Sequence, residues 1–143
     1  MKKLYSAIAA TGLALIVSGC TSNSLSIAEM EKLNEKQICN IEVNGIAKVL
    51  ASAEKYNAVA KEQRVEFKRL GMTTTEYIAG AKKAIETNSK TVPLTKNKKP
   101  TKNSVSVSYA AQRACKFAVS ALTLKAEGKK TWREAVPGDG FKY

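Results

Sequence analysis

Apolar residues recur at helical spacing over most of the 143-residue chain, and this period constrains the fold more than any other feature. Side chains three or four positions apart share one face of a helix. The pattern predicts a first helix over 27–70, a second from Thr73 that fades at Thr87-Asn88, and a third over 107–126 that Gly128 ends. Capping boxes, in which a Ser or Thr precedes a Glu by three positions, mark helix starts. They begin at Ser26, Thr73 and Thr131, and the last of them opens a short C-terminal turn.

The first predicted helix is long for a globular protein, in which helices average about 11–12 residues. We therefore expect a kink at Asn44-Gly45 or a break near Asn57. Residues 88–104 are polar, contain Pro93 and Pro100 and show little periodicity, which is typical of a loop. No segment alternates convincingly as a strand. The sequence thus predicts an all-α fold: a small bundle of three main helices plus a short C-terminal turn.

The first twenty residues differ from the rest of the chain. A positive head, Lys2-Lys3, precedes an apolar run from Leu4 to Val17. This run is shorter than the roughly 20 apolar residues that span a hydrocarbon core, and it suits the central part of a secretory signal peptide. It ends in Val17-Ser18-Gly19-Cys20. This end resembles the lipobox of bacterial lipoprotein signal peptides, which consists of a branched aliphatic residue, two small residues and an obligatory Cys.

The resemblance implies that Cys20 receives a diacylglyceryl thioether and becomes the mature N-terminus, where a further acyl chain such as palmitate is added. Thr21 stands where an Asp retains enteric lipoproteins in the inner membrane, which implies an outer-membrane location facing the periplasm. Residues 1–19 would be removed, 20–26 would form a lipidated tether, and 27–143 a single helical domain with a basic loop over about 88–104. The alternative is a plain secretory signal with an incidental Cys.

Once Cys20 is lipidated, two cysteines remain. The cell envelope outside the inner membrane is oxidising, so Cys39 and Cys115 predict a disulfide between two helices. A redox role is the alternative, but the Cys-x-x-Cys spacing of redox motifs is missing.

The residue types argue against most enzyme classes. The chain has no His, which removes Ser-His, Cys-His and His-ligated metal sites, and Asp139 is its only Asp. We therefore expect neither catalysis nor a cofactor or metal. A small envelope hydrolase that acts on peptidoglycan or lipid through Glu or Ser-Lys chemistry is the alternative.

The chain has a formal net charge of +12, and the excess is concentrated in one segment. No acidic residue lies between Glu86 and Glu127, whereas eight basic residues do. Those predicted to bind an anionic surface are Lys90, Lys96, Lys98, Lys99 and Lys102. Lysines act there as point charges. The alternative is a basic loop that only aids solubility.

Anchor and charge together favour a non-enzymatic envelope lipoprotein that binds or blocks a partner or surface at the periplasmic face of the membrane. Besides the membrane that holds the acyl chains, the candidate partners are anionic lipid, lipopolysaccharide, peptidoglycan and an acidic protein. Protection of the producing cell, as by exclusion lipoproteins, is a variant. Nucleic acid is not expected, because the location is extracytoplasmic and only 6% of residues are aromatic.

Overall fold

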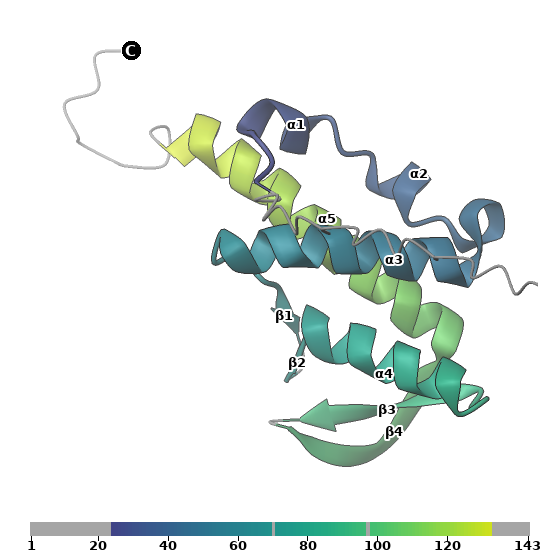
Figure 1. Ribbon diagram of the computed structural model, residues 1–143. Helices are drawn as coiled ribbons and strands as arrows, with labels where there is room; N and C mark the ends of the chain where they lie inside the picture. The colour runs from purple at the N-terminus through teal and green to yellow at the C-terminus, as the bar shows by residue number, and fades with distance from the viewer. Residues whose placement is uncertain (1–23, 70, 97, 133–143) are drawn as a thin grey trace, which may run out of the picture.

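The computed structural model describes residues 24–69, 71–96 and 98–132 (Figure 1). Its elements are α1 (Ile27–Glu31), α2 (Glu35–Ile38), α3 (Ile41–Glu62), β1 (Lys68–Arg69), β2 (Met72–Thr73), α4 (Thr74–Glu86), β3 (Thr91–Lys96), β4 (Lys99–Ser106) and α5 (Val107–Thr131). Strands β1 and β2 pair antiparallel, as do β3 and β4. The predicted all-α bundle of three main helices is therefore wrong: the described residues form five helices and two hairpins.

The segment predicted as one long first helix is three helices. Ser26 caps α1 with the expected capping box. The Asn34 side chain accepts from the Gln37 N–H and starts α2, and the Asn40 side chain starts α3. Asparagine competes well for backbone N–H groups at such positions, so each one restarts the helix in a new direction.

The kink expected at Asn44-Gly45 is confirmed, because Gly45 interrupts α3 with φ 72° and ψ 160°. The alternative break near Asn57 is wrong, and so is the continuation to residue 70, since α3 ends at Glu62. Gln63 caps the helix, and Arg64 follows with φ 58°. The chain then enters the short β1–β2 hairpin, whose turn contains Gly71 at φ 87°.

The two later helices begin where the sequence predicts. Thr73 and Glu76 form the capping box of α4, and Ser106 caps α5 through the Tyr109 N–H. However, α5 continues through Gly128 to Thr131, so the predicted stop at Gly128 is wrong. Thr131, predicted to cap a short C-terminal turn, is instead the last residue of α5, and its hydroxyl donates to the Glu127 carbonyl at 3.2 Å, so that predicted start is wrong. The rest of the predicted turn, after Trp132, lies outside the described residues.

The predicted loop over 88–104 is mostly a β-hairpin. Strand β3 pairs with β4 in the register Thr91–Ser106 to Lys96–Lys99, with an irregularity between Pro93 and Thr95. Proline is normally excluded from strands because it lacks an N–H donor, but both strands of an isolated two-stranded ribbon are edges. Pro93 and Pro100 are therefore compatible with this hairpin, although they mark a loop in the sequence.

Helix α5 is the central element of the core. It contacts all four other helices and both strands of the second hairpin. Alanines 110, 111, 114 and 118 of α5 are fully buried, which lets neighbouring helices approach closely. Near its middle, the Phe117 ring stacks on Phe67 with 4.7 Å between centroids and meets Tyr77 edge-on at 5.9 Å.

The predicted disulfide between Cys39 and Cys115 is confirmed. It joins the junction between α2 and α3 to α5, with 5.6 Å between the two Cα atoms and both residues buried. The bond closes a sequence separation of 76 residues. Closing a loop of that length in the unfolded chain stabilises the fold by about 4–5 kcal/mol in the chain-entropy account.

Glu66 connects α3 to the start of α4. Its Oε1 accepts hydrogen bonds from the Thr75 N–H at 2.9 Å, the Thr75 hydroxyl, and the amide of the buried Asn57 at 3.2 Å. Burial raises the pKa of Glu66, but the hydrogen bonds from Thr75 and Asn57 together outweigh it, so the pKa lies below its ordinary value. The carboxylate form thus holds this corner together.

Candidate anionic-surface site

One buried side chain fixes the β3–β4 hairpin to the helices. Val92 is 0% exposed and lies against Gly80 of α4. A Cβ atom at residue 80 would come within 2.6 Å of Val92 Cγ1, so this close approach requires glycine. At the base of the hairpin, the Val107 N–H donates to the Lys90 carbonyl at 3.3 Å. The hairpin is thus held against α4 and the start of α5 (Figure 1).

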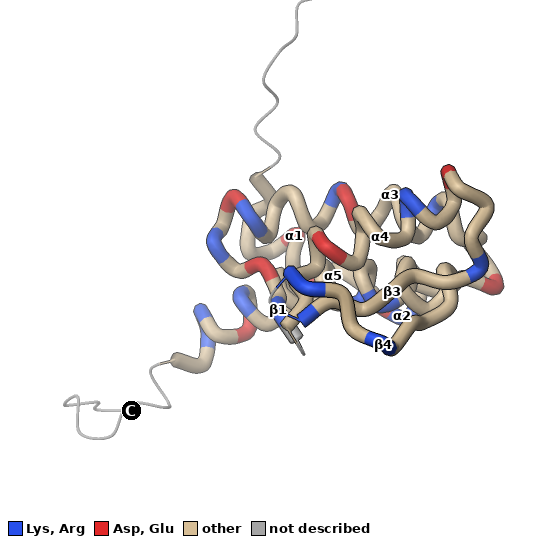
Figure 2. Tube along the Cα trace, turned by 90° about the horizontal axis from the view of Figure 1, so that it is seen from below, with Lys and Arg blue, Asp and Glu red and all other residues tan. Residues whose placement is uncertain are grey.

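The end of β3, the turn of the hairpin and the first half of β4 carry four lysines, which we call the hairpin lysines: Lys96, Lys98, Lys99 and Lys102. Lys96 lies directly opposite Lys99, and Lys98 stands in the turn between them with φ 65°. All four side chains are exposed. In Figure 2, which looks at the molecule from the hairpin side, β3 and β4 carry blue positions and no red ones. The pairing thus brings to one end of a ribbon charges that the sequence shows only as a run.

Among the residues that the structure describes, the hairpin lysines have no carboxylate partner. Within the part of the chain that the structure describes, the ion pairs are Lys82–Glu54 at 2.6 Å and Lys130–Glu31 at 2.7 Å. Like charges placed directly opposite in a ribbon destabilise it, by an amount comparable to the 0.2–1 kcal/mol of a favourable cross-strand pair. The Lys96–Lys99 pair therefore costs stability in the isolated molecule, and an anionic surface would remove that cost.

Other basic residues between Glu86 and Glu127 lie away from the hairpin lysines. Lys90 precedes β3 and is separated from the turn by six strand residues, about 20 Å at the usual rise. Arg113 packs over the ring of Phe117 at 4.7 Å, and the Lys125 ammonium donates to the Gln63 carbonyl at 3.3 Å. The structure thus brings together four of the five lysines predicted to bind an anionic surface. Lys90 stands apart from them.

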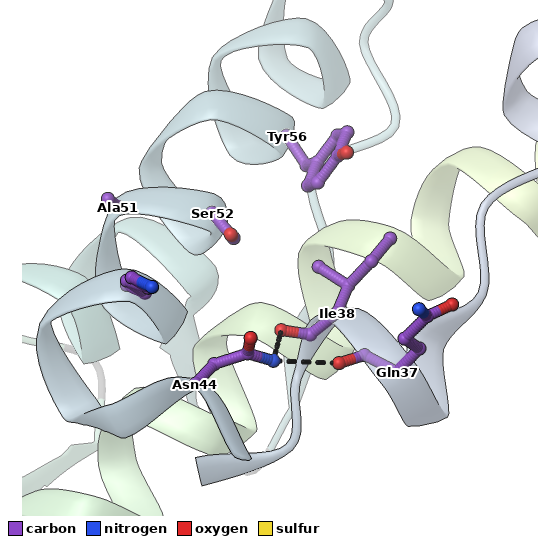
Figure 3. Close-up of a pocket in the computed structure, with 7 residues that line it drawn as sticks. Gln37, Ile38, Asn44, Ala51, Ser52 and Tyr56 are labelled. Atoms are coloured by element: carbon purple, nitrogen blue, oxygen red, sulfur yellow. Dashed lines mark hydrogen bonds between the residues drawn. The ribbon is translucent and has the colours of Figure 1, made fainter.

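The hollows on the described surface are open and shallow. One of about 450 Å³ lies between α2 and α3, where the Asn44 amide donates to the Gln37 and Ile38 carbonyls at 2.8 and 3.4 Å (Figure 3). Lys48 and Ser52 also line it, but among the described hydrogen bonds none joins these two side chains. This hollow holds no carboxylate and so offers no acid–base pair of the hydrolase type.

The described ranges hold neither a cluster of metal ligands nor a membrane-spanning helix. Across residues 24–132, apart from 70 and 97, no three Cys, Asp or Glu side chains gather as metal ligands would. None of the helices in the same ranges combines the length and apolar character needed to span a membrane. Cys20 and the lipobox lie outside the described residues.

Sequence reasoning found the hairpin lysines from the acid-free run, but it missed the residues that position them. In the sequence, Gly80 only lowers the helix propensity of its segment. The contact with Val92 is what explains why a glycine stands at this position. The comparisons with known proteins add no relative: no family model, no curated protein and no solved structure matches this chain.

Proposed function

We propose that this protein is a non-enzymatic, lipid-anchored envelope protein that binds an anionic surface through the hairpin lysines. The observation that supports this proposal most directly is at the end of the β3–β4 hairpin. Lys96, Lys98 and Lys99 lie together there, without an acidic partner among the described residues. The buried Val92 holds the ribbon against Gly80 of α4, so the hairpin that carries these charges is supported by the helices.

The expected strength follows from the number of charges. A Lys near an anionic membrane surface contributes about 1 kcal/mol, so four contribute roughly 4 kcal/mol, or about a thousandfold in affinity. Lysine heads are compact and make no bidentate contacts, which suits a surface of repeated phosphates or carboxylates better than one shaped ligand. The proposed target is therefore a polyanionic surface of the envelope, either lipid headgroups or cell-wall carboxylates.

The anchor in this proposal is Cys20. A single acyl chain holds a protein only marginally, whereas two or three make the attachment stable. Replacing Cys20 with Ser should release the chain from the membrane fraction or leave it unprocessed. Processed Cys20→Ser protein that still sediments with membranes would contradict the anchor.

The hairpin is tested with the Cys20→Ser chain from which residues 1–19 have been removed, so that it carries neither lipid nor the apolar leader. Its co-sedimentation with phosphatidylglycerol vesicles and with purified cell-wall sacculi identifies which polyanion is bound. A variant with all four hairpin lysines changed to Gln should lose binding to the polyanion that the unsubstituted chain binds. The matched control changes four exposed lysines of the charge-balanced N-terminal half: Lys32, Lys36, Lys48 and Lys61.

Both variants lower the net charge equally, so they separate a local site from overall charge. Retained binding by the control and lost binding by the hairpin variant would support the site. Equal binding by the two variants would contradict it.

A further inference from the structure

The C-terminal end of α5 projects past the rest of the bundle (Figure 1). Residues 127–132 are all exposed, and Trp132 keeps 52% of its surface in solvent. Lys125, Gly128, Lys129 and Trp132 line an open hollow of about 320 Å³. A large aromatic ring flanked by lysines at a protruding helix end is the composition found at membrane–water interfaces.

The chain enters the domain next to this end. The Leu25 carbonyl accepts from the Gln63 side-chain amide at 3.3 Å, and the Gln63 carbonyl accepts from the Lys125 ammonium at 3.3 Å. Leu25 and Ile27 pack on the same buried cluster as Leu122 and Ala126 of α5. The first described residues and the Trp132 hollow are therefore neighbours.

The distance to the proposed anchor is limited by the length of the chain. Cys20 lies five residues before Leu25, and a fully extended chain covers at most about 3.6 Å per residue, or about 18 Å in total. An acylated Cys20 would therefore keep Leu25 within that distance of the bilayer surface. Gln63, at the end of α3, connects Leu25 to Lys125 of α5, so the α5 end is one of the parts of the domain that this limit keeps close to the bilayer.

We propose that the α5 end, defined by Lys125, Lys129 and Trp132, is the face that the domain sets on the bilayer holding its anchor, with the indole among the headgroups and the lysines on their phosphates. This inference rests on the lipid anchor of the proposed function. The contact adds charge and aromatic attraction to acyl chains that already hold the protein at the surface.

This placement also orients the hairpin. In Figure 1 the β3–β4 hairpin lies on one side of α3 and α4, and α1 with the C-terminal part of α5 lies on the other. With the α5 end on the bilayer, α3 and α4 stand between the bilayer and the hairpin.

Trp132 is the only Trp of the chain, so its fluorescence reports this face directly. The full processed chain is reconstituted in vesicles of phosphatidylethanolamine and phosphatidylglycerol. We expect a blue-shifted emission relative to the Cys20→Ser chain in solution, several-fold weaker quenching by acrylamide, and quenching by lipids brominated close to the headgroup. Lys129→Glu should reverse part of the shift, whereas Lys48→Glu, an exposed charge on α3, should leave it unchanged.

The outcomes separate this inference from the proposed function. A chain that floats with the vesicles while Trp132 stays accessible to acrylamide would overturn the inference and leave the anchor intact. A chain that fails to float with vesicles would overturn both. Equal effects of Lys129→Glu and Lys48→Glu would show that the shift reflects general charge, which also overturns the proposed face.

Discussion

Replacing Gly80 with Ala tests how the hairpin is held. The new Cβ would lie 2.6 Å from Val92 Cγ1, whereas non-bonded carbon atoms rest about 3.5–4.0 Å apart. The overlap is therefore about 1 Å. Val92 is 0% exposed and cannot swing into solvent, so β3 itself has to shift.

The magnitude follows from two opposing terms. Alanine is favoured over glycine inside a helix by about 1 kcal/mol. Overpacking a filled interior costs typically about 1–3 kcal/mol. We therefore expect Gly80→Ala to change the free energy of unfolding by between about zero and 2 kcal/mol in the destabilising direction. Gly128→Ala is the matched control, because a Cβ there meets nothing within 4 Å, and it should stabilise by about 1 kcal/mol.

Urea unfolding of the Cys20→Ser chain, followed by circular dichroism, measures both changes from the midpoint at constant slope. In a Val92→Ala background, which removes the obstructing methyl group, Gly80→Ala should become stabilising by about 1 kcal/mol. If Gly80→Ala stabilises the unsubstituted chain as much as Gly128→Ala does, the close approach of β3 to α4 is refuted.

The disulfide and Glu66 give two more predictions. Reducing the Cys39–Cys115 bond should lower the free energy of unfolding by about 4–5 kcal/mol, measured by the same urea titration with and without reductant, and an unchanged midpoint would contradict the structural role. The pKa of Glu66 is lowered in the folded chain, so its contribution is present above the ordinary carboxyl pKa and is lost as pH falls through the lowered value. Glu66→Gln should therefore flatten the acid limb of a stability–pH curve, and a curve that keeps its full steepness would count against the bonds to Thr75 and Asn57.

The sequence predicts α4 and α5 well because their signals are local. A capping box and a run of apolar positions at helical spacing need no knowledge of the rest of the chain. The Cys39–Cys115 disulfide is equally predictable from the sequence, because only these two cysteines remain once Cys20 is assigned to the anchor. The breaks at Asn34 and Asn40 were missed because a lone Asn cap lies within the apolar period and does not interrupt it.

The β3–β4 hairpin cannot be predicted from such local sequence signals. Proline is excluded from the central strands of a sheet, so two prolines in this segment indicate a loop. They are compatible with the hairpin only because both of its strands are edge strands. Its position depends on Gly80, which is remote in sequence from the strand it accommodates. The cluster of lysines was visible as composition, but the opposition of Lys96 to Lys99 required the register. Tertiary contacts therefore decided both the fold class and the shape of the candidate site.

The central claim is that the hairpin lysines bind a polyanionic surface by charge, and salt tests it most directly. The affinity of the Cys20→Ser chain for phosphatidylglycerol vesicles or sacculi, whichever it binds, is measured across rising ionic strength. The unsubstituted chain and the charge-matched control should lose affinity steeply as salt screens the contact, while the four-lysine hairpin variant should bind weakly and respond little. A hairpin variant with the same affinity and the same salt dependence as the control would contradict the claim.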